Sequence, residues 1–278
     1  MLVKEALECA RDKLKNNNIK NPLSEAKYIM KYVLNADDTF FILHLNDELC
    51  DKDIKLYEDC VTKRCANMPL SYITGEKEFM GLPFYVDKET LIPRPETEII
   101  TEYIINNFGN RKLDILEIGV GSGCISLSIA YYLENARIMG VDINKKALVT
   151  ANKNIRRYGL EDRVRFVFSD LYDNVKDKYD IIISNPPYIK SDVIETLEDD
   201  VKNYEPVLAL DGGADGLYFY RKIINHADEY LNEEGYIVLE IGYDQAHEVK
   251  NLLEKNNFKN INIIKDLAGF DRTITAQK

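Results

Sequence analysis

A strand, a glycine-rich loop and a helix follow one another near the middle of the chain, and this unit constrains the fold more than any other feature. The strand is the apolar run at residues 113–118, the loop is Gly119-Val120-Gly121-Ser122-Gly123, and a helix is predicted from Cys124. Glycines let a backbone adopt positive φ and approach a ligand closely. The unit is typical of the first strand of a nucleotide-binding α/β sheet, although a tight strand-to-helix turn gives the same pattern.

Polar residues also follow the next two predicted strands. One apolar run ends at Asp142, and the run after it leads into Asp170 and Leu171. An acidic residue after the second strand can accept hydrogen bonds from two ribose hydroxyls, but Asp142 can equally cap a helix that starts near Asn144. Asp170 can face an adenine amino group, and Leu171 can cover the ring.

The tetrapeptide Asn185-Pro186-Pro187-Tyr188 follows a fourth buried run, residues 180–183. Because each proline lacks an N–H and fixes its own φ, the Asn amide and nearby carbonyls are available to a ligand. Two acceptors can take both hydrogens of a planar –NH2 group while the Tyr ring supports its plane. Alone, the tetrapeptide is also typical of a turn. Its position beside the other strand ends favours a site, because open α/β sheets bind ligands at that edge.

Taken together, these segments resemble the S-adenosylmethionine-dependent methyltransferases, and among them the protein-(glutamine-N5) methyltransferases of peptide-chain release factors. Residues 117–123 are similar to the cofactor loop, and residues 185–188 to the motif of enzymes that methylate a planar amino nitrogen. The resemblance covers nearly the full length. Further similar segments lie at residues 69–75, 91–98, 205–217, 240–245 and 266–272.

The resemblance implies a cofactor and a set of site residues. S-adenosylmethionine is the implied methyl donor, with S-adenosylhomocysteine as the product. The implied cofactor contacts are Glu117, Ile118, Gly119, Val120, Gly121, Asp142, Asp170, Leu171 and Asn185. The implied catalytic residues are Asn185, Pro186, Pro187 and Tyr188. Leu171 stands where the family often carries an aromatic residue, and a leucine loses ring stacking on adenine.

The implied reaction transfers a methyl group to the side-chain amide nitrogen (N5) of the glutamine in the Gly-Gly-Gln motif of peptide-chain release factors. The alternative is an amino methyltransferase acting on DNA adenine N6 or ribosomal RNA guanine N2, which uses the same tetrapeptide. A third hypothesis is a non-catalytic binding protein that keeps the cofactor fold. With 47 acidic and 36 basic side chains, the net charge is −11, which disfavours broad phosphate-backbone binding. We therefore expect no direct nucleic-acid binding.

The expected fold is α/β: a seven-stranded Rossmann-like methyltransferase sheet, a small all-α N-terminal domain and a β-hairpin linker. We expect the helical domain at residues 1–75, the linker at 76–93 and the methyltransferase domain at 94–278. The helical domain is either a bundle without a site or a substrate-docking module, and the resemblance favours docking. In it, Asn21-Pro22 predicts an N-cap and a first-turn proline. Strands are expected near residues 113–118, 136–141, 163–168, 179–183, 235–241, 260–265 and 271–276, the last two as an antiparallel pair.

Cysteine and histidine usage indicates neither a metal site nor a disulfide framework. The 5 cysteines form no Cys-x-x-Cys pair, and the 3 histidines are not grouped with carboxylates at metal-ligand spacing. An odd, scattered set of cysteines is typical of a reducing cytosol, so we expect a cytoplasmic protein. We find no signal peptide and no apolar stretch long enough to cross a membrane. A monomer is expected, because no segment has a large apolar exposed face.

Overall fold

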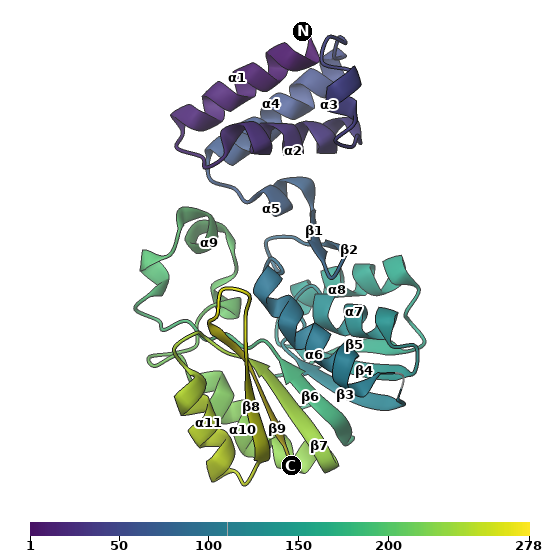
Figure 1. Cartoon of the computed structure of the whole chain (residues 1–278), viewed down its shortest axis with the longest axis vertical. Coiled ribbons are helices and arrows are strands. Elements are labelled where there is room, and N and C mark those ends of the chain that lie inside the picture. The colour runs from purple at the N-terminus through teal and green to yellow at the C-terminus, as the bar shows by residue number, and fades with distance from the viewer. Residues whose placement is uncertain (110) are drawn as a thin grey trace. The chain divides into compact units, whose positions relative to one another are not determined.

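The computed structural model describes residues 1–109 and 111–278 (Figure 1). The described chain divides into two compact units. The first comprises Met1–Gly75 together with Glu198–Tyr204, and the second comprises Glu76–Leu197 together with Glu205–Lys278. The sequence patterns give no sign that residues 198–204 group with the N-terminal helices.

The first unit consists of short helices around its own apolar core. Its helices are α1 (Val3–Asn16), α2 (Pro22–Leu34), α3 (Phe40–Leu43), α4 (Asp51–Cys65), α5 (Leu70–Thr74) and α9 (Asp199–Tyr204). Apolar residues at helical spacing form this core, and within it Leu14, Ile29 and Tyr57 are completely or almost completely buried. The Tyr57 hydroxyl donates to the Ala26 carbonyl at 3.1 Å, so the buried phenol keeps a hydrogen-bond partner.

Polar contacts hold the segment 198–204 within this unit. The Lys20 ammonium lies 2.7 Å from a Glu198 carboxylate oxygen. The Tyr204 hydroxyl donates to the Ala66 carbonyl at 2.6 Å. The Lys20–Glu198 pair is exposed and adds little stability.

The start of α2 differs from the prediction in one respect. Pro22 is its first residue, as expected, but Asn21 has φ 52° and ψ 50° and its side chain makes no capping hydrogen bond. A side-chain N-cap normally requires an extended backbone, which a left-handed residue does not provide. The expected Asn21 side-chain cap is therefore wrong.

The second unit begins with the predicted β-hairpin. Strand β1 (Glu76–Phe79) pairs antiparallel with β2 (Leu82–Tyr85). Met80 and Gly81 both have positive φ, as a tight two-residue hairpin turn requires. A short 3-10 helix, η1 (Pro95–Thr97), then leads into α6 (Glu98–Phe108).

The expected seven-stranded sheet is confirmed, with strand order β5-β4-β3-β6-β7-β9-β8 within the described residues. The strands are β3 (Leu113–Ile118), β4 (Ala136–Asp142), β5 (Val164–Phe168), β6 (Tyr179–Ser184), β7 (Leu231–Glu240), β8 (Lys259–Lys265) and β9 (Asp271–Gln277). The strands from β5 to β7 are parallel, and β9 pairs antiparallel with both β7 and β8, as predicted. Strand β7 begins four residues earlier than expected, across an irregular register beside β6.

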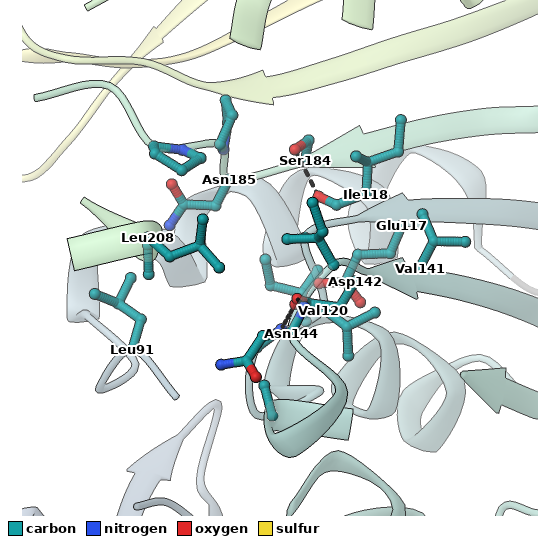
Figure 2. Close-up of a pocket in the computed structure, with 18 of the residues that line it drawn as sticks. Leu91, Glu117, Ile118, Val120, Val141, Asp142, Asn144, Ser184, Asn185 and Leu208 are labelled. Carbon is teal, nitrogen blue, oxygen red and sulfur yellow. Dashed lines mark hydrogen bonds between the residues drawn. The ribbon is translucent and has the colours of Figure 1, made fainter. Parts of the chain in front are cut away.

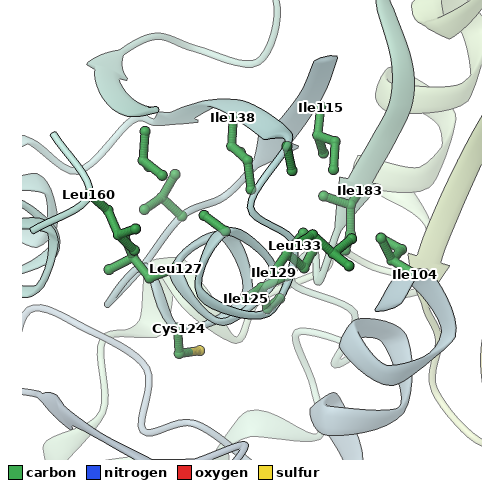
Figure 3. Packing of buried hydrophobic residues seen from close by; sticks show 14 of the residues in the cluster. Ile104, Ile115, Cys124, Ile125, Leu127, Ile129, Leu133, Ile138, Leu160 and Ile183 are labelled. Atoms are coloured by element: carbon green, nitrogen blue, oxygen red, sulfur yellow. The ribbon is translucent and has the colours of Figure 1, made fainter. Parts of the chain in front are cut away.

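Helices cover both faces of this sheet, in the layers that Figure 1 shows. They are α6, α7 (Cys124–Tyr132), α8 (Lys145–Tyr158), α10 (Tyr218–Tyr230) and α11 (Ala246–Lys255), and the short turns η2 (Ile194–Thr196) and η3 (Val207–Ala209) lie between strands β6 and β7 in the chain. Ile115 and Ile183 belong to a cluster with α6, α7 and α8, which Figure 3 shows around α7. Leu116 and Ile182 belong to a second cluster with α10 and α11. Alternate residues of β3 and β6 thus face opposite layers, so both central strands are buried on both faces.

The chain beyond β6 is fixed by a second segment, residues 209–217. Ile189 and the backbone of this segment exchange hydrogen bonds: Ile189 N–H donates to the Leu210 carbonyl at 3.0 Å, and Gly212 N–H donates to the Ile189 carbonyl at 2.8 Å. The Gln245 amide donates to the carbonyls of Tyr188 at 3.0 Å and Gly216 at 3.2 Å. These bonds hold the backbone just after the strand end in one position.

Gly216 allows the two backbone segments to approach closely because it has no side chain. Its replacement should therefore destabilise the protein by more than the backbone strain alone. Its φ is +74°, and a Cβ there would lie 2.5 Å from the Tyr188 carbonyl oxygen. Gly159, at φ +63°, has nothing within 4 Å of the same position. We expect Gly159→Ala to lower the free energy of unfolding by about 1 kcal/mol, and Gly216→Ala by about 2–4 kcal/mol, in urea titrations. Equal losses of stability in the two variants would show that the close contact between Gly216 and the Tyr188 carbonyl adds nothing to the cost of the substitution.

Candidate active site

A pocket lies where the parallel strands end, and strand ends β3 to β6 all contribute to it (Figure 2). Its walls are completed by residues near η1, by the turn η3 and by α10. Residues that line it include Leu91, Thr97, Glu117, Ile118, Gly119, Val120, Gly121, Asp142, Asp170, Leu171, Asn185, Pro186, Pro187, Leu208 and Phe219. All predicted site residues except Tyr188 therefore lie around one cavity.

The glycine loop after β3 turns the backbone toward this pocket. Gly119 and Gly121 have φ of 81° and 56°, which other residue types rarely adopt. Gly119 N–H donates to the Val141 carbonyl at 2.8 Å, and Gly123 N–H donates to the Val120 carbonyl at 2.8 Å. These bonds hold the loop against the end of β4.

Asp142 at the end of β4 holds the glycine loop directly. One carboxylate oxygen accepts from Gly121 N–H at 2.8 Å, and the other accepts from Asn144 N–H at 2.7 Å. The N-cap of α8 is instead Asn144, whose side chain accepts from Lys146 N–H at 3.0 Å. Of the two possibilities that the sequence left open, a helix cap by Asp142 is therefore not formed. Burial raises the pKa of Asp142 against these hydrogen bonds, which lower it.

Glu117, the fifth residue of β3, is the most unusual carboxylate in the pocket. It is fully buried, and one of its oxygens accepts from both the backbone N–H and the hydroxyl of Ser126. The other oxygen has no hydrogen-bond partner among the described residues. Burial raises the pKa of Glu117 to about 8, opposed by the Ser126 hydrogen bonds. An unpartnered acceptor in a pocket wall fits a ligand that brings a donor or a positive charge.

The end of β5 supplies Asp170 and Leu171. Asp170 is exposed, and Leu171 has a φ of 47°, which is uncommon for a leucine. The Ser169 hydroxyl donates to the Leu171 carbonyl at 2.9 Å and stabilises this turn. Both predicted residues therefore line the pocket, and their contacts with a cofactor stay a prediction.

The tetrapeptide begins directly after β6. Ser184, the last residue of that strand, donates its hydroxyl to the Ile118 carbonyl at 2.6 Å and joins the ends of β6 and β3. In Figure 2 the Asn185 side chain extends toward the side of the pocket where Leu91 and Leu208 lie. Its amide nitrogen donates to the Thr97 hydroxyl oxygen at 3.2 Å.

Tyr188 has a different environment from the rest of the tetrapeptide. It does not line the pocket, and it packs against the second apolar cluster. Its hydroxyl donates to Glu240 Oε1 at 3.2 Å, and burial raises its pKa. Its predicted role in supporting a flat substrate group stays a prediction.

Thr97, in the pocket wall, and Glu240, behind it, are two polar residues that the sequence analysis does not assign to the site. Thr97 ends η1, lines the pocket and bonds Asn185, while Glu240 ends β7 and bonds Tyr188. Both lie in segments whose resemblance to the family is noted above. The sequence therefore marked both segments as similar to the family. It could not show which side chain each residue contacts, because the partners are distant in the sequence and meet only in the fold.

Residues 1–109 and 111–278 contain neither a cluster of side chains that could ligate a metal nor a helix suited to span a bilayer. No group of three or more His, Cys, Asp or Glu side chains in these residues could hold a metal ion. No helix in the same part of the chain is both long and apolar enough to span a bilayer.

Glu117 should leave a signature in the pH dependence of stability. Its pKa of about 8 in the folded protein lies above its ordinary value of 4.5, so the folded state keeps a proton that the unfolded state releases. The free energy of unfolding should therefore fall as pH rises between these values. Glu117→Gln should make this pH-dependent decrease in the free energy of unfolding smaller by a few kcal/mol, as measured by urea unfolding at several pH values across that range.

The flattening should be partial, because Glu240 contributes with the same sign. Its pKa is raised to about 7, again by burial. A Glu117→Gln profile that parallels the wild type between about pH 5 and 8 would contradict a buried, protonated Glu117.

Two protein-family models match this chain, and a solved structure shares its fold. The model of the PrmC N-terminal domain matches residues 5–75, and that of the methyltransferase small domain matches residues 95–213. A solved structure of a methyltransferase from Pyrococcus furiosus shares the fold, with a TM-score of 0.54 and 21% identity, over 73% of this chain and 91% of that chain.

Full-length relatives are more similar. A release factor glutamine methyltransferase from Clostridium botulinum is 42% identical over 100% of both chains. One from Clostridium acetobutylicum is 40% identical over 99% of this chain and 98% of its own length. The similarity spans the helical unit, the hairpin and the sheet alike, and the chain therefore belongs to the release factor glutamine methyltransferase family.

Proposed function

We propose that this enzyme transfers a methyl group from S-adenosylmethionine to the side-chain amide nitrogen of the glutamine in the Gly-Gly-Gln motif of peptide-chain release factors. Family membership over the full length supports the substrate. The observation that carries the chemistry is the position of Asn185, whose side chain lines the same pocket as the glycine loop and Asp142.

The residues present fit S-adenosylmethionine. The loop at Gly119–Gly121 would approach the cofactor closely, and Asp142 would accept from its ribose hydroxyls. Asp170 and Leu171 would face the adenine. A bound cation would lower the raised pKa of Glu117 and favour its ionised form, and that carboxylate would in turn favour the cationic donor over its product S-adenosylhomocysteine, which has lost the sulfonium charge. When bound, the cofactor supplies an electrophilic methyl group.

The protein must make an amide nitrogen reactive, because its lone pair is delocalised into the carbonyl. Acceptors at the Asn185 side chain and the Pro186 carbonyl would take the two amide hydrogens and orient the nitrogen. These hydrogen bonds strengthen as the nitrogen gains positive charge, so they stabilise the transition state more than the ground state. Correct positioning can supply roughly 7–11 kcal/mol in favourable cases.

The prolines and Tyr188 would keep this arrangement rigid. Pro186 and Pro187 cannot donate hydrogen bonds and have fixed φ, so the backbone after β6 has few alternatives. The Gln245 bond to the Tyr188 carbonyl restricts it further. The nitrogen can lose its extra proton after methyl transfer, so the proposal needs no general base.

Methylation of a nucleobase amino group is the competing function, since it needs the same geometry at the nitrogen. The relatives named above favour a protein substrate, and the net charge of −11 argues against broad contact with phosphates. We further propose that the enzyme acts as a monomer in the cytoplasm, where release factors work.

Asn185→Ala should remove most turnover, while cofactor affinity should fall by a smaller factor than the rate. We expect kcat to fall at least about 100-fold, because a transition-state acceptor is lost. Transfer of a labelled methyl group to purified release factor measures the rate, and calorimetry measures cofactor affinity. Asn106→Ala, which removes an exposed amide on α6, is the matched control and should retain full activity.

The substrate itself provides the second control. A release factor whose Gly-Gly-Gln glutamine is replaced by alanine should accept no label, and mass spectrometry of the wild-type factor should locate one methyl group on that glutamine. Label that appears instead on DNA or RNA would contradict the proposed function. Parallel loss of cofactor affinity and rate in Asn185→Ala would contradict the role of Asn185.

A further inference from the structure

The two oxygens of the buried Glu117 carboxylate have different surroundings. One oxygen, Oε2, accepts from the Ser126 backbone N–H at 3.2 Å and also from the Ser126 hydroxyl. The other oxygen, Oε1, has no hydrogen-bond partner among the described residues, although Glu117 lines the pocket. Glu117 is 0% exposed, so neither oxygen can take a partner from bulk water. One oxygen is therefore fixed to the protein, while the other remains an unsatisfied acceptor in the pocket wall.

Ser126 can fix the carboxylate because it is the third residue of α7. The N–H groups of a first helical turn have no carbonyl partner within the helix, and they carry partial positive charge. Gly123, which precedes α7, has no side chain that could accept from them. Glu117 therefore takes the place of a capping side chain, and the Ser126 hydroxyl adds a second donor from the same residue.

The Ser126 hydroxyl also stabilises the negative charge of this carboxylate. A hydrogen bond donated to a carboxylate favours its ionised form, whereas burial disfavours it. Burial accordingly raises the pKa of Glu117, the Ser126 hydrogen bonds lower it, and the charge of Asp142 raises it. Without the hydroxyl, burial would be less opposed and the charge would be harder to form.

A carboxylate in the pocket wall distinguishes ligands by their charge. S-adenosylmethionine carries a sulfonium cation, whereas S-adenosylhomocysteine has a neutral thioether at the same atom. The amino-acid ammonium and carboxylate groups are common to both. Because Oε1 of Glu117 is shielded from water, its attraction for a cation is screened less than that of an exposed carboxylate. An ionised Glu117 therefore favours the donor over the product.

We propose that Ser126 is a positioning residue for cofactor selection. Together with the start of α7, it holds Glu117 so that the unsatisfied oxygen supplies the negative charge by which the pocket prefers the sulfonium donor to its product. Ser126 does not line the pocket, so it acts only through Glu117. The inference rests on the S-adenosylmethionine dependence proposed above, and it adds a reason why the product does not block the site after transfer.

Calorimetric titration of the full-length enzyme with each ligand at pH 7 tests this role. The donor preference is the Kd of the product divided by the Kd of the donor. Ser126→Ala should lower it about 3- to 10-fold, mainly through weaker donor binding, because a hydrogen bond to a charged group is lost. Ser128→Ala is the matched control: Ser128 lies on the same helix, is fully buried, and its hydroxyl has no hydrogen-bond partner among the described residues. It should keep the wild-type preference.

Glu117→Gln removes the charge but nearly keeps the shape of the side chain. It should lower the donor preference about 10-fold or more. In the double variant, Ser126→Ala should add no further loss, since no carboxylate remains for the hydroxyl to act on. Additive losses would overturn the proposal, because Ser126 would then act independently of Glu117. Equal losses of affinity for donor and product would also overturn it, because Glu117 would then bind a group that both ligands share.

The pH dependence gives a readout that a merely structural role of Ser126 would not change. Because the pKa of Glu117 is raised to about 8, most of the carboxyl group must lose a proton at pH 7 before it can attract the donor. The donor preference should therefore rise between about pH 6 and pH 8 and level off above. The rise should move to higher pH in Ser126→Ala and be absent in Glu117→Gln. The neighbouring titratable groups, Asp142 and the Cys124 thiol, are the same in all variants and cannot produce these differences.

These measurements need no release factor, so their failure differs from failure of the proposed function. A wild-type enzyme that shows the donor preference but does not methylate the release factor would contradict the proposed function and leave this inference standing. A wild-type enzyme that methylates the Gly-Gly-Gln glutamine, while Ser126→Ala keeps the wild-type preference at every pH, would overturn the inference alone.

Discussion

Burial of the central strands on both faces is the constraint on which the rest of this structure depends. Ile115, Leu116, Ile182 and Ile183 are all fully buried between two layers of helices. Inside such a sheet an unpaired polar group is costly, so polar side chains are confined to the strand ends. The carboxyl ends of four neighbouring strands meet at one edge, and the pocket, the glycine loop and the tetrapeptide all lie there.

Two carboxylates, Glu117 and Glu240, depart from this rule. Each is buried near the carboxyl end of its strand, has a pKa raised by burial, and keeps one oxygen without a partner among the described residues. Selection for stability alone would not favour either, because well-packed apolar residues are often as stable. Both lie where a carboxylate has a structural or ligand-binding use: Glu117 lines the pocket, and Glu240 accepts a hydrogen bond from Tyr188, the last residue of the tetrapeptide.

Much of this organisation is predictable from local sequence, because continuous aliphatic runs bounded by Gly, Asn, Asp or Pro define buried parallel strands to within a residue or two. Strand β7 begins earlier than predicted because Asn-Glu-Glu-Gly near its start interrupts the apolar pattern. The bond between Asn185 and Thr97 joins residues 88 apart, and no local pattern encodes it. The same holds for the Tyr188 hydroxyl, whose partner Glu240 lies 52 residues away.

The segment Glu198–Tyr204 has a consequence for how the protein can be divided. It is flanked on both sides by the second unit yet groups with the first, so the backbone passes from one unit to the other three times. A fragment that starts at residue 76 would retain this segment but lose Lys20 and Ala66, its partners in the helical unit. A single cut therefore cannot yield two intact modules. A protein that kept the second unit without the first would need a different sequence at residues 198–204.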